Sequence, residues 1–140
     1  SRGLSALVFR GADSGLDELT TTDANQVWLV SGGAVVETVF DARESLGMAS
    51  STIEDLAGGE AAENAEVARD VLSGGGADAV RDAVALNVAA GILAWEGLEN
   101  PVTRSDFESR MRGAAERALA ALADGSGARL IERWVAASNV

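Results

Sequence analysis

Three short runs in the N-terminal part of the sequence have the hydrophobic pattern of β-strands. Residues 4–11, LSALVFRG, are almost continuously apolar, which is typical of a buried strand in a sheet covered on both faces. Residues 25–40, NQVWLVSGGAVVETVF, hold two β-branched and aromatic runs on either side of Gly32 and Gly33. Such a glycine pair between two strand-like runs predicts a β-hairpin. The chain is therefore expected to begin with one strand and a hairpin.

Beyond Phe40 the spacing of apolar residues changes to that of helices. Ser51 and Glu54 have the spacing of a capping box and predict a short helix at TIEDLA. Residues 60–72 predict a second helix, which three glycines at 74–76 bring to an end. Residues 77–97 predict a long third helix, and Ser105 with Glu108 predicts the capping box of a fourth. Residues 128–138 predict a last helix at the end of the sequence.

The apolar stripes of these helices identify the side chains expected to face the core. In residues 77–97 the positions that share one face are Val80, Val84, Asn87, Val88, Gly91 and Trp95. In the helix that follows Ser105 they are Phe107, Met111, Ala114, Ala118 and Leu122. In residues 128–138 they are Leu130, Ile131, Trp134 and Val135.

The order of these elements bounds the architecture. Strands come first and helices follow, without an internal repeat or a clear linker, which indicates an α+β arrangement or the tail of a larger α/β domain. One strand and a hairpin make a thin sheet for four to five helices. We therefore interpret residues 1–140 as a single partial domain whose remaining strands lie upstream.

Composition narrows the possible partners and chemistry. The 11 Lys and Arg residues against 22 Asp and Glu residues give a net charge of −11, which disfavours nucleic acid and anionic membranes as partners. No apolar run approaches the roughly 18 residues of a membrane span, and we expect a cytoplasmic protein. The sequence has no Cys and no His, which removes thiolate ligands and the commonest general base. Chemistry here would depend on carboxylates, hydroxyls, arginine or a hard metal ion.

The segment SGLDELTTT, residues 14–22, is the leading candidate for a metal site. Asp13, Asp17 and Glu18 place three carboxylates within six residues, and in a loop such side chains can converge on one ion. Oxygen ligands of this kind suit Mg²⁺. A solvated acidic turn is the commoner outcome of this spacing alone. The threonines at 20–22 could line a site or form an ordinary loop that leads into a strand.

Other polar positions are expected to have structural roles. GGEAAENA, residues 58–65, is not a phosphate-binding loop, because Glu60 and Glu63 would repel phosphate; it predicts a glycine break with acids at a helix start. Asn87 lies on an apolar helix face and is expected to bind a loop or neighbouring backbone. Arg2 and Arg10 could reach a phosphate, although a surface salt bridge is the expected role.

Several motifs together carry a family resemblance. GLDEL (residues 15–19), GGEAAENA and RDAVALNVAA (residues 81–90), preceded by ALVFRG, resemble in this order the C-terminal part of anthranilate phosphoribosyltransferases. The resemblance covers essentially all 140 residues, and LTTT is similar to actinobacterial members. It implies an α/β fold of the nucleoside phosphorylase/phosphoribosyltransferase type, of which this chain would be the C-terminal portion of the large domain. The N-terminal helical domain and the diphosphate loop would be absent.

The resemblance also implies an activity. The family transfers phosphoribosyl from 5-phosphoribosyl-1-diphosphate to the amino group of anthranilate in tryptophan biosynthesis, with Mg²⁺ assisting the departure of diphosphate. Its adjacent Asp-Glu pair coordinates this ion, so Asp17 and Glu18 are the expected metal ligands. Catalysis would rest on positioning and electrostatic stabilisation, and no catalytic residue is assigned within the chain.

Departures from the family pattern limit what the chain is expected to do alone. Arg10 stands where the family often has His, and the segments that bind diphosphate and anthranilate lie upstream. The isolated chain is therefore expected to be inactive without the missing N-terminal segment, through which the full-length family forms homodimers. Alternatives are a nucleic-acid-binding relative of the same fold, which the charge disfavours, a related phosphoribosyl-transferring or phosphorolytic enzyme with another base, and a structural domain in which Asp17 and Glu18 bind nothing.

Overall fold

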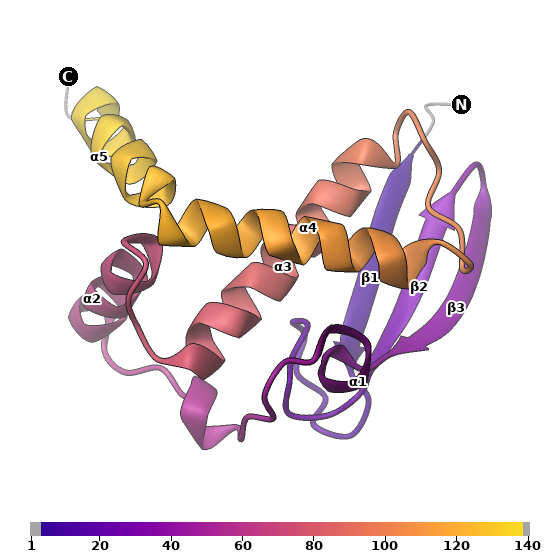
Figure 1. Ribbon diagram of the computed structural model, residues 1–140, viewed down its shortest axis with the longest axis horizontal. Helices are drawn as coiled ribbons and strands as arrows, with labels where there is room; N and C mark the ends of the chain where they lie inside the picture. The colour runs from indigo at the N-terminus through magenta and orange to yellow at the C-terminus, as the bar shows by residue number, and fades with distance from the viewer. Residues whose placement is uncertain (1–3, 139–140) are drawn as a thin grey trace.

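The predicted strand and hairpin join into one antiparallel sheet. The computed structural model describes residues 4–138 (Figure 1). In it, β1 (Ser5–Gly11), β2 (Asn25–Ser31) and β3 (Ala34–Phe40) lie in the order β1-β2-β3. Gly32 and Gly33 form the hairpin turn with φ angles of 57° and 83°, which glycine adopts without steric cost. The hairpin prediction is confirmed.

Five α-helices and a 3-10 turn follow the sheet within residues 4–138, in agreement with the predicted four to five helices. Their bounds are α1 (Ala42–Leu46), η1 (Glu54–Leu56), α2 (Ala61–Leu72), α3 (Asp78–Glu96), α4 (Phe107–Ala123) and α5 (Ser126–Ser138). The sequence pattern did not predict α1. Its N-terminus is capped by Asp41, whose side chain accepts a hydrogen bond from the Arg43 backbone N–H at 2.9 Å. None of these helices is both long and apolar enough to cross a membrane.

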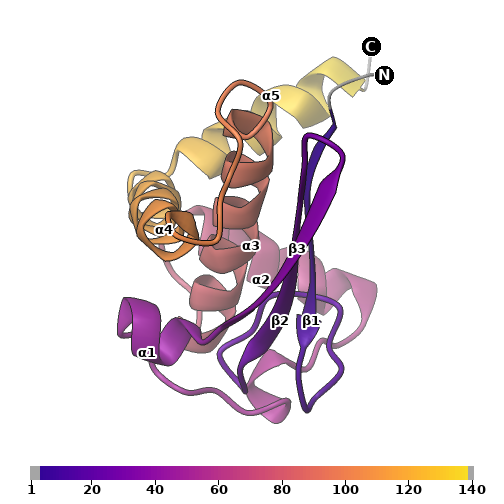
Figure 2. The ribbon, with the colours of Figure 1, turned by 90° about the vertical axis from the view of Figure 1, so that its right-hand side faces the viewer.

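Helices α3 and α4 cover one face of the sheet (Figure 2). Their contact encloses the larger hydrophobic core, in which the rings of Phe40 and Phe107 meet edge to face with centroids 5.4 Å apart. Val27 and Leu29 of β2 are buried in this core. On the opposite face of the sheet Val8, Val35 and Val39 are exposed. Within the described residues, the expectation that β1 is covered on both faces is therefore wrong.

Helix α3 buries a different face from the predicted one. Trp95 is 76% exposed and Val88 is also exposed. This helix is apolar around most of its circumference, so its pattern does not select one face. The face it buries combines three alanines, which allow close approach, with two leucines. The buried positions are Ala85, Leu86, Ala89, Ala90 and Leu93.

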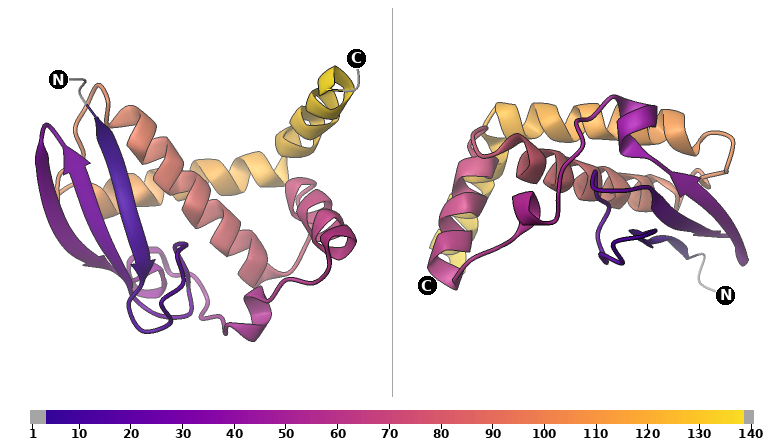
Figure 3. Two further views of the ribbon diagram at one scale, coloured as in Figure 1. Left: turned by 180° about the vertical axis from the view of Figure 1, so that it is seen from behind. Right: turned by 90° about the horizontal axis from the view of Figure 1, so that it is seen from below.

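Helices α2 and α5 lie together at the end of the molecule away from the sheet (Figure 3). A smaller cluster of Val71, Ala85, Ala118 and Leu122 lies where α2, α3 and α4 meet. Helix α5 has no buried residue, and Trp134 is 69% exposed, so the prediction that its apolar stripe faces the core is wrong. The stripe predicted for α4 is confirmed, since Phe107, Met111, Ala114, Ala118 and Leu122 are all buried.

Both predicted capping boxes are wrong by one or two residues. Thr52 and Asp55, not Ser51 and Glu54, exchange bonds at η1: the Thr52 N–H donates to Asp55 Oδ2 at 2.8 Å, and the Asp55 N–H donates to Thr52 Oγ1 at 3.2 Å.

The same displacement occurs before α4. There the Thr103 N–H donates to Asp106 Oδ1 at 2.8 Å, in place of the predicted pair of Ser105 and Glu108. In both cases the observed pair, like the predicted pair, is a Ser or Thr followed three positions later by an acidic residue.

Candidate functional site

The loop between β1 and β2, residues 12–24, carries the candidate carboxylates, and we call it the carboxylate loop. Two backbone bonds close it, from Gly11 N–H to the Leu16 carbonyl at 2.7 Å and from Ala12 N–H to the Ala24 carbonyl at 2.8 Å. The chain crosses itself closely at Gly11, where an added Cβ would lie 2.1 Å from Ser14 Oγ. Any other residue at Gly11 would have to displace the Ser14 side chain, whose hydroxyl donates to Asp23.

Asp23 fixes the first half of the carboxylate loop. Its carboxylate accepts hydrogen bonds from the backbone N–H groups of Asp13 and Ser14 at 2.6 and 2.7 Å. The hydroxyls of Ser14 and Thr22 each donate to it at 3.1 Å. Partial burial by itself raises the pKa of Asp23, but these four bonds outweigh it and hold the pKa below the usual value of 3.8. Asp23 is therefore a structural carboxylate.

Asp17 and Glu18 are exposed at the other side of this loop. Partial burial raises the pKa of Glu18 above its usual value of 4.5, and the adjacent Asp17 raises it further, through a side-chain hydrogen bond and through charge repulsion. Both residues also line the hollow described below. No group of three or more Asp, Glu, His or Cys side chains that could hold a metal forms in residues 4–138, so Asp13 does not join this pair.

Two asparagines hold the backbone directly after Glu18. Asn87 of α3 accepts from the Leu19 N–H at 3.1 Å and donates to the Leu19 carbonyl at 2.9 Å. Asn25 of β2 makes the same pair of bonds with Thr20, both at 2.9 Å. The prediction that Asn87 binds a loop is confirmed.

The threonine run belongs mainly to the structural framework. Thr20 and Thr21 are buried, and Thr21 Oγ1 lies 2.8 Å from Ser51 Oγ. This hydroxyl pair explains why Ser51 is not free to cap η1. Thr20 alone of the three threonines contributes to the hollow beside the carboxylates. The run is therefore chiefly the loop that leads into β2.

A hollow of about 700 Å³ opens beside Asp17 and Glu18. Apolar side chains of α3 and η1 form its opposite side, among them Val80, Val84 and Leu56. Its polar lining residues are Asp17, Glu18 and Thr20 near the carboxylates and Asn87, which lies on α3 among the apolar side chains. A pocket with an apolar side and a few convergent polar groups is the usual form of a small-molecule site.

The remaining sequence candidates lie outside this hollow. At GGEAAENA the Glu60 N–H donates to the Glu63 carboxylate at 2.8 Å, as the predicted acidic helix start requires. Arg10 donates to Gln26 Oε1 at 3.1 Å, so its expected salt bridge is wrong. Arg2 lies outside the described residues.

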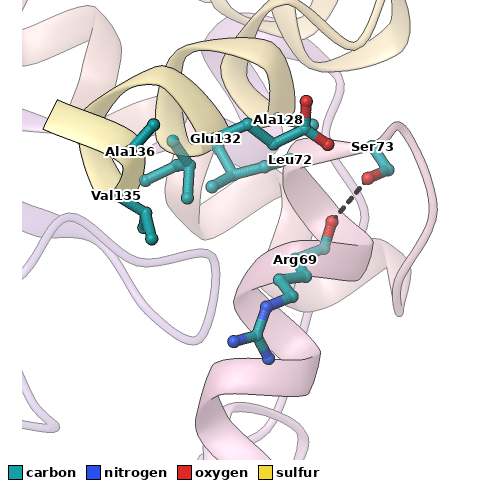
Figure 4. Close-up of a pocket in the computed structure, with 8 residues that line it drawn as sticks. Arg69, Leu72, Ser73, Ala128, Glu132, Val135 and Ala136 are labelled. Carbon is teal, nitrogen blue, oxygen red and sulfur yellow. Dashed lines mark hydrogen bonds between the residues drawn. The ribbon is translucent and has the colours of Figure 1, made fainter. Parts of the chain in front are cut away.

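A second hollow, of about 470 Å³, lies between α2 and α5 (Figure 4). Leu72, Ala128 and Val135 give it a largely aliphatic lining, with Arg69 and Glu132 at its sides. Ser73 Oγ donates to the Arg69 carbonyl at 2.7 Å, which is a local helix-end bond. Its lining holds one carboxylate, Glu132, whereas two acids line the hollow at the carboxylate loop, so we place the functional site at that loop.

Sequence reasoning missed Asp23 and Asn25. Both fall in TTTDAN, where Asp23 lies two positions before β2 and Asn25 begins it, and such residues commonly accept bonds from nearby backbone. This sequence pattern indicates that Asp23 and Asn25 can accept bonds from the backbone, but it does not identify which backbone N–H groups need an acceptor.

Comparison with known proteins places this arrangement in a family. The glycosyl transferase family, a/b domain, matches residues 2–128. The anthranilate phosphoribosyltransferase of Arthrobacter sp. (strain FB24) is 47% identical over 135 residues, which is 96% of this chain and 36% of that protein. The chain thus spans little more than a third of the length of this curated relative.

Solved structures agree with this assignment. The anthranilate phosphoribosyltransferase of Thermus thermophilus superposes with a TM-score of 0.75 at 32% identity, over 94% of this chain and 35% of that one. The Saccharomyces cerevisiae enzyme, described in complex with PRPP and Mg, has a TM-score of 0.58 at 21% identity, over 86% and 35%, and shows the shared fold alone. The predicted resemblance to anthranilate phosphoribosyltransferases is confirmed, and the chain belongs to the glycosyl transferase family through its a/b domain.

Proposed function

We propose that this chain forms part of an anthranilate phosphoribosyltransferase and that Asp17 and Glu18 hold its Mg²⁺. The observation that carries the proposal is that these two adjacent carboxylates both line the 700 Å³ hollow, in a chain 47% identical to such an enzyme over 96% of its length. The name of the Saccharomyces structure, with PRPP and Mg, supports the choice of substrate and ion.

The two carboxylates fit a magnesium ion. Mg²⁺ in phosphate-binding sites commonly takes one or two protein carboxylates, and water and substrate phosphate complete its shell. Asp17 and Glu18 are exposed, and two adjacent carboxylates repel each other in the absence of a cation. Asp23, by contrast, already uses its oxygens within the loop.

In the proposed reaction the bond from ribose C1 to the diphosphate oxygen breaks, and a bond from C1 to the anthranilate nitrogen forms with loss of one amine proton. The ion would neutralise charge on the leaving diphosphate. Asp17 and Glu18 would hold it at the loop, and the apolar side of the hollow would limit water at this edge. No side chain of the described residues is assigned as nucleophile or proton carrier, so the chain's contribution is positioning and charge.

The chain supplies only part of such a site. It matches about a third of the relatives' length, so we propose that residues 1–140 correspond to the C-terminal part of the large domain and are inactive without the rest. Binding of anthranilate and most of the diphosphate shell would then come from regions that this chain does not match. The homodimer and the cytoplasmic location stay predictions. The net charge of −11 weighs against the nucleic-acid-binding alternative.

A chimera tests the proposal. This chain would replace the matched 135 residues of the Arthrobacter enzyme, and formation of phosphoribosylanthranilate would be followed with Mg²⁺ present. Asp17→Asn/Glu18→Gln is expected to lower kcat/KM about 100-fold, because a charge-stabilising group is lost. Asp13→Asn, an exposed acid of the same loop outside the pair, is the matched control and is expected to keep full activity. Equal activity of all three chimeras would return Asp17 and Glu18 to the role of a solvated turn.

A further inference from the structure

Leu19 and Thr20 are held from opposite sides by side-chain amides, although they belong to no strand. Asn87 pairs with both backbone groups of Leu19, and Asn25 pairs with both backbone groups of Thr20. We call these four residues the asparagine clamp. An amide side chain carries one donor group and one acceptor, as a peptide group does, so each asparagine replaces the pairing that a neighbouring strand would give.

The two asparagines are anchored differently. Asn25 is fully buried and donates a further bond to the Phe40 carbonyl at 3.2 Å, so it belongs to the core of the sheet. Asn87 is half-buried at the edge of the hollow and donates also to the Ala83 carbonyl at 2.8 Å within α3. Asn87 thus connects the carboxylate loop to a helix 68 positions away in sequence.

The asparagine clamp lies directly after Glu18, where it can oppose the electrostatic repulsion between Asp17 and Glu18. Two adjacent carboxylates repel each other and tend to separate in the absence of a cation. The Leu19 side chain is buried in the core, and the Leu19 peptide groups are bound by Asn87. The backbone therefore cannot turn at Leu19 to relieve the repulsion.

We propose that Asn87 is a positioning residue that holds Asp17 and Glu18 side by side at the hollow, in the arrangement a divalent cation requires. The proposal rests on the proposed function, since it takes this pair to be the cation ligands. Residues that orient metal ligands without touching the metal are worth about 10- to 100-fold in metal affinity. Asn87 would act in this way through the backbone of Leu19.

The test measures cation binding and not enzyme activity. The 140-residue chain would be titrated with Mn²⁺, and bound ion would be counted from the loss of the free Mn²⁺ electron paramagnetic resonance signal. Asn87→Leu removes both bonds to Leu19 at similar volume and unchanged charge. We expect it to weaken Mn²⁺ binding about tenfold, at the lower end of the range for outer ligand-orienting groups.

A matched control is available on α2. Asn64 makes the same two-bond pairing with Gly59, both bonds being 2.9 Å long, but at the start of a different helix. Asn64→Leu is expected to leave Mn²⁺ affinity unchanged. Thermal unfolding of both variants would be recorded, so that a general loss of structure is separated from a loss of loop geometry.

The outcomes separate the two proposals. Binding that is lost in Asp17→Asn/Glu18→Gln and is unchanged in Asn87→Leu overturns the role of Asn87 and leaves the ligand assignment intact. Equal binding by the double variant and the unaltered chain, or no binding by either, overturns both. If Asn87→Leu does not fold, Asn87→Ala makes the same comparison, because water from the hollow can then reach the Leu19 peptide groups. An unchanged affinity in a folded Asn87→Ala would equally contradict the proposal.

Discussion

The sheet end and the α2–α5 end of the molecule differ in the size and number of the apolar side chains that they bury. At the sheet end, large side chains from three elements meet, with Phe40 and Phe107 in edge-to-face contact and Met111 fully buried beside them. At the other end, the smaller cluster contains two alanines with Val71 and Leu122, and α5 adds no buried residue to it.

This difference shows where the fold can hold a site rigidly. Free energy from apolar burial grows with the area removed from water, so the sheet end carries most of the stability. The carboxylate loop is attached there, through Leu19 in the core and Asn25 in β2. A loop tied to the α2–α5 end would share the lower opening free energy expected of a shallow cluster.

Removing an aromatic ring from the sheet end should have the largest effect. Phe107→Ala deletes a fully buried side chain and its contact with Phe40. We expect the free energy of unfolding to fall by about 3 to 5 kcal/mol, measured by urea denaturation. Trp95→Ala removes an exposed aromatic side chain and should change it by less than about 0.5 kcal/mol. Similar losses in the two variants would contradict the view that this core dominates.

A deletion in the smaller cluster should cost less. Leu122→Ala is expected to lower the free energy of unfolding by about 2 kcal/mol, at the low end for buried leucines, because the neighbouring helices can close part of the space. The same urea titrations measure it. A loss as large as that of Phe107→Ala would show that the α2–α5 end is packed as firmly as the sheet.

Asp23 makes the sheet end sensitive to acid. Its lowered pKa means that the folded state favours the charged form, so its stabilisation is present above the usual pKa of 3.8 and is lost as pH falls through the lower folded-state pKa. Asp23→Asn should therefore lower the free energy of unfolding by about 1 to 2 kcal/mol at pH 7. The difference from the unaltered chain should shrink when the titration is repeated near pH 3.

The matched variant lies at the other end. The pKa of Asp124 is also lowered, through hydrogen bonds from Ser126, but Asp124 is fully solvated. Asp124→Asn should have a smaller effect at either pH. A larger effect for Asp124→Asn than for Asp23→Asn would reverse the assignment of acid sensitivity to the carboxylate loop.

A substitution on the exposed face of α5 should have the smallest effect on the free energy of unfolding. Trp134→Ala is expected to change the free energy of unfolding by less than about 0.5 kcal/mol, because the indole is mostly solvated in the folded chain. Urea denaturation followed by far-ultraviolet circular dichroism measures this without relying on tryptophan fluorescence. A loss above about 1 kcal/mol would show that the indole packs against the fold in solution.

The sequence pattern predicted the structure correctly where it allowed only one interpretation. The hairpin at Gly32 and Gly33 and the buried stripe of α4 were predictable, because turn residues and one clear apolar face define them. The face of α3 was not, since apolar residues surround most of that helix. The caps failed for a related reason: Ser51 and Thr52 each precede an acid by three positions, and a tertiary bond to Thr21 takes Ser51 away.

The residues of the candidate site also divide into those that the sequence could predict and those that it could not. The spacing of Asp13, Asp17 and Glu18 marked the loop as a candidate, but a solvated turn was its commoner outcome, and the family resemblance was needed to single out Asp17 and Glu18 as expected ligands. For Asn87, its place on an apolar helix face was enough to predict that it binds a loop. The assignment of Asp23 and Asn25 required knowing which backbone groups a loop leaves unpaired. That depends on how the loop folds back on Gly11, which no local sequence pattern describes.

The crossing at Gly11 also limits how this sequence can vary. Every other standard amino acid has a Cβ, and at this position it would meet Ser14 Oγ at 2.1 Å and Asp23 Oδ1 at 3.0 Å. Selection for function at this codon should therefore favour glycine, since any other residue has to displace the Ser14 hydroxyl that donates to Asp23. At Gly91 and Gly113, where a Cβ would meet nothing within 4 Å, the same selection should admit alanine. Gly11 thus limits the sequences that can form the carboxylate loop, even though it takes no part in chemistry.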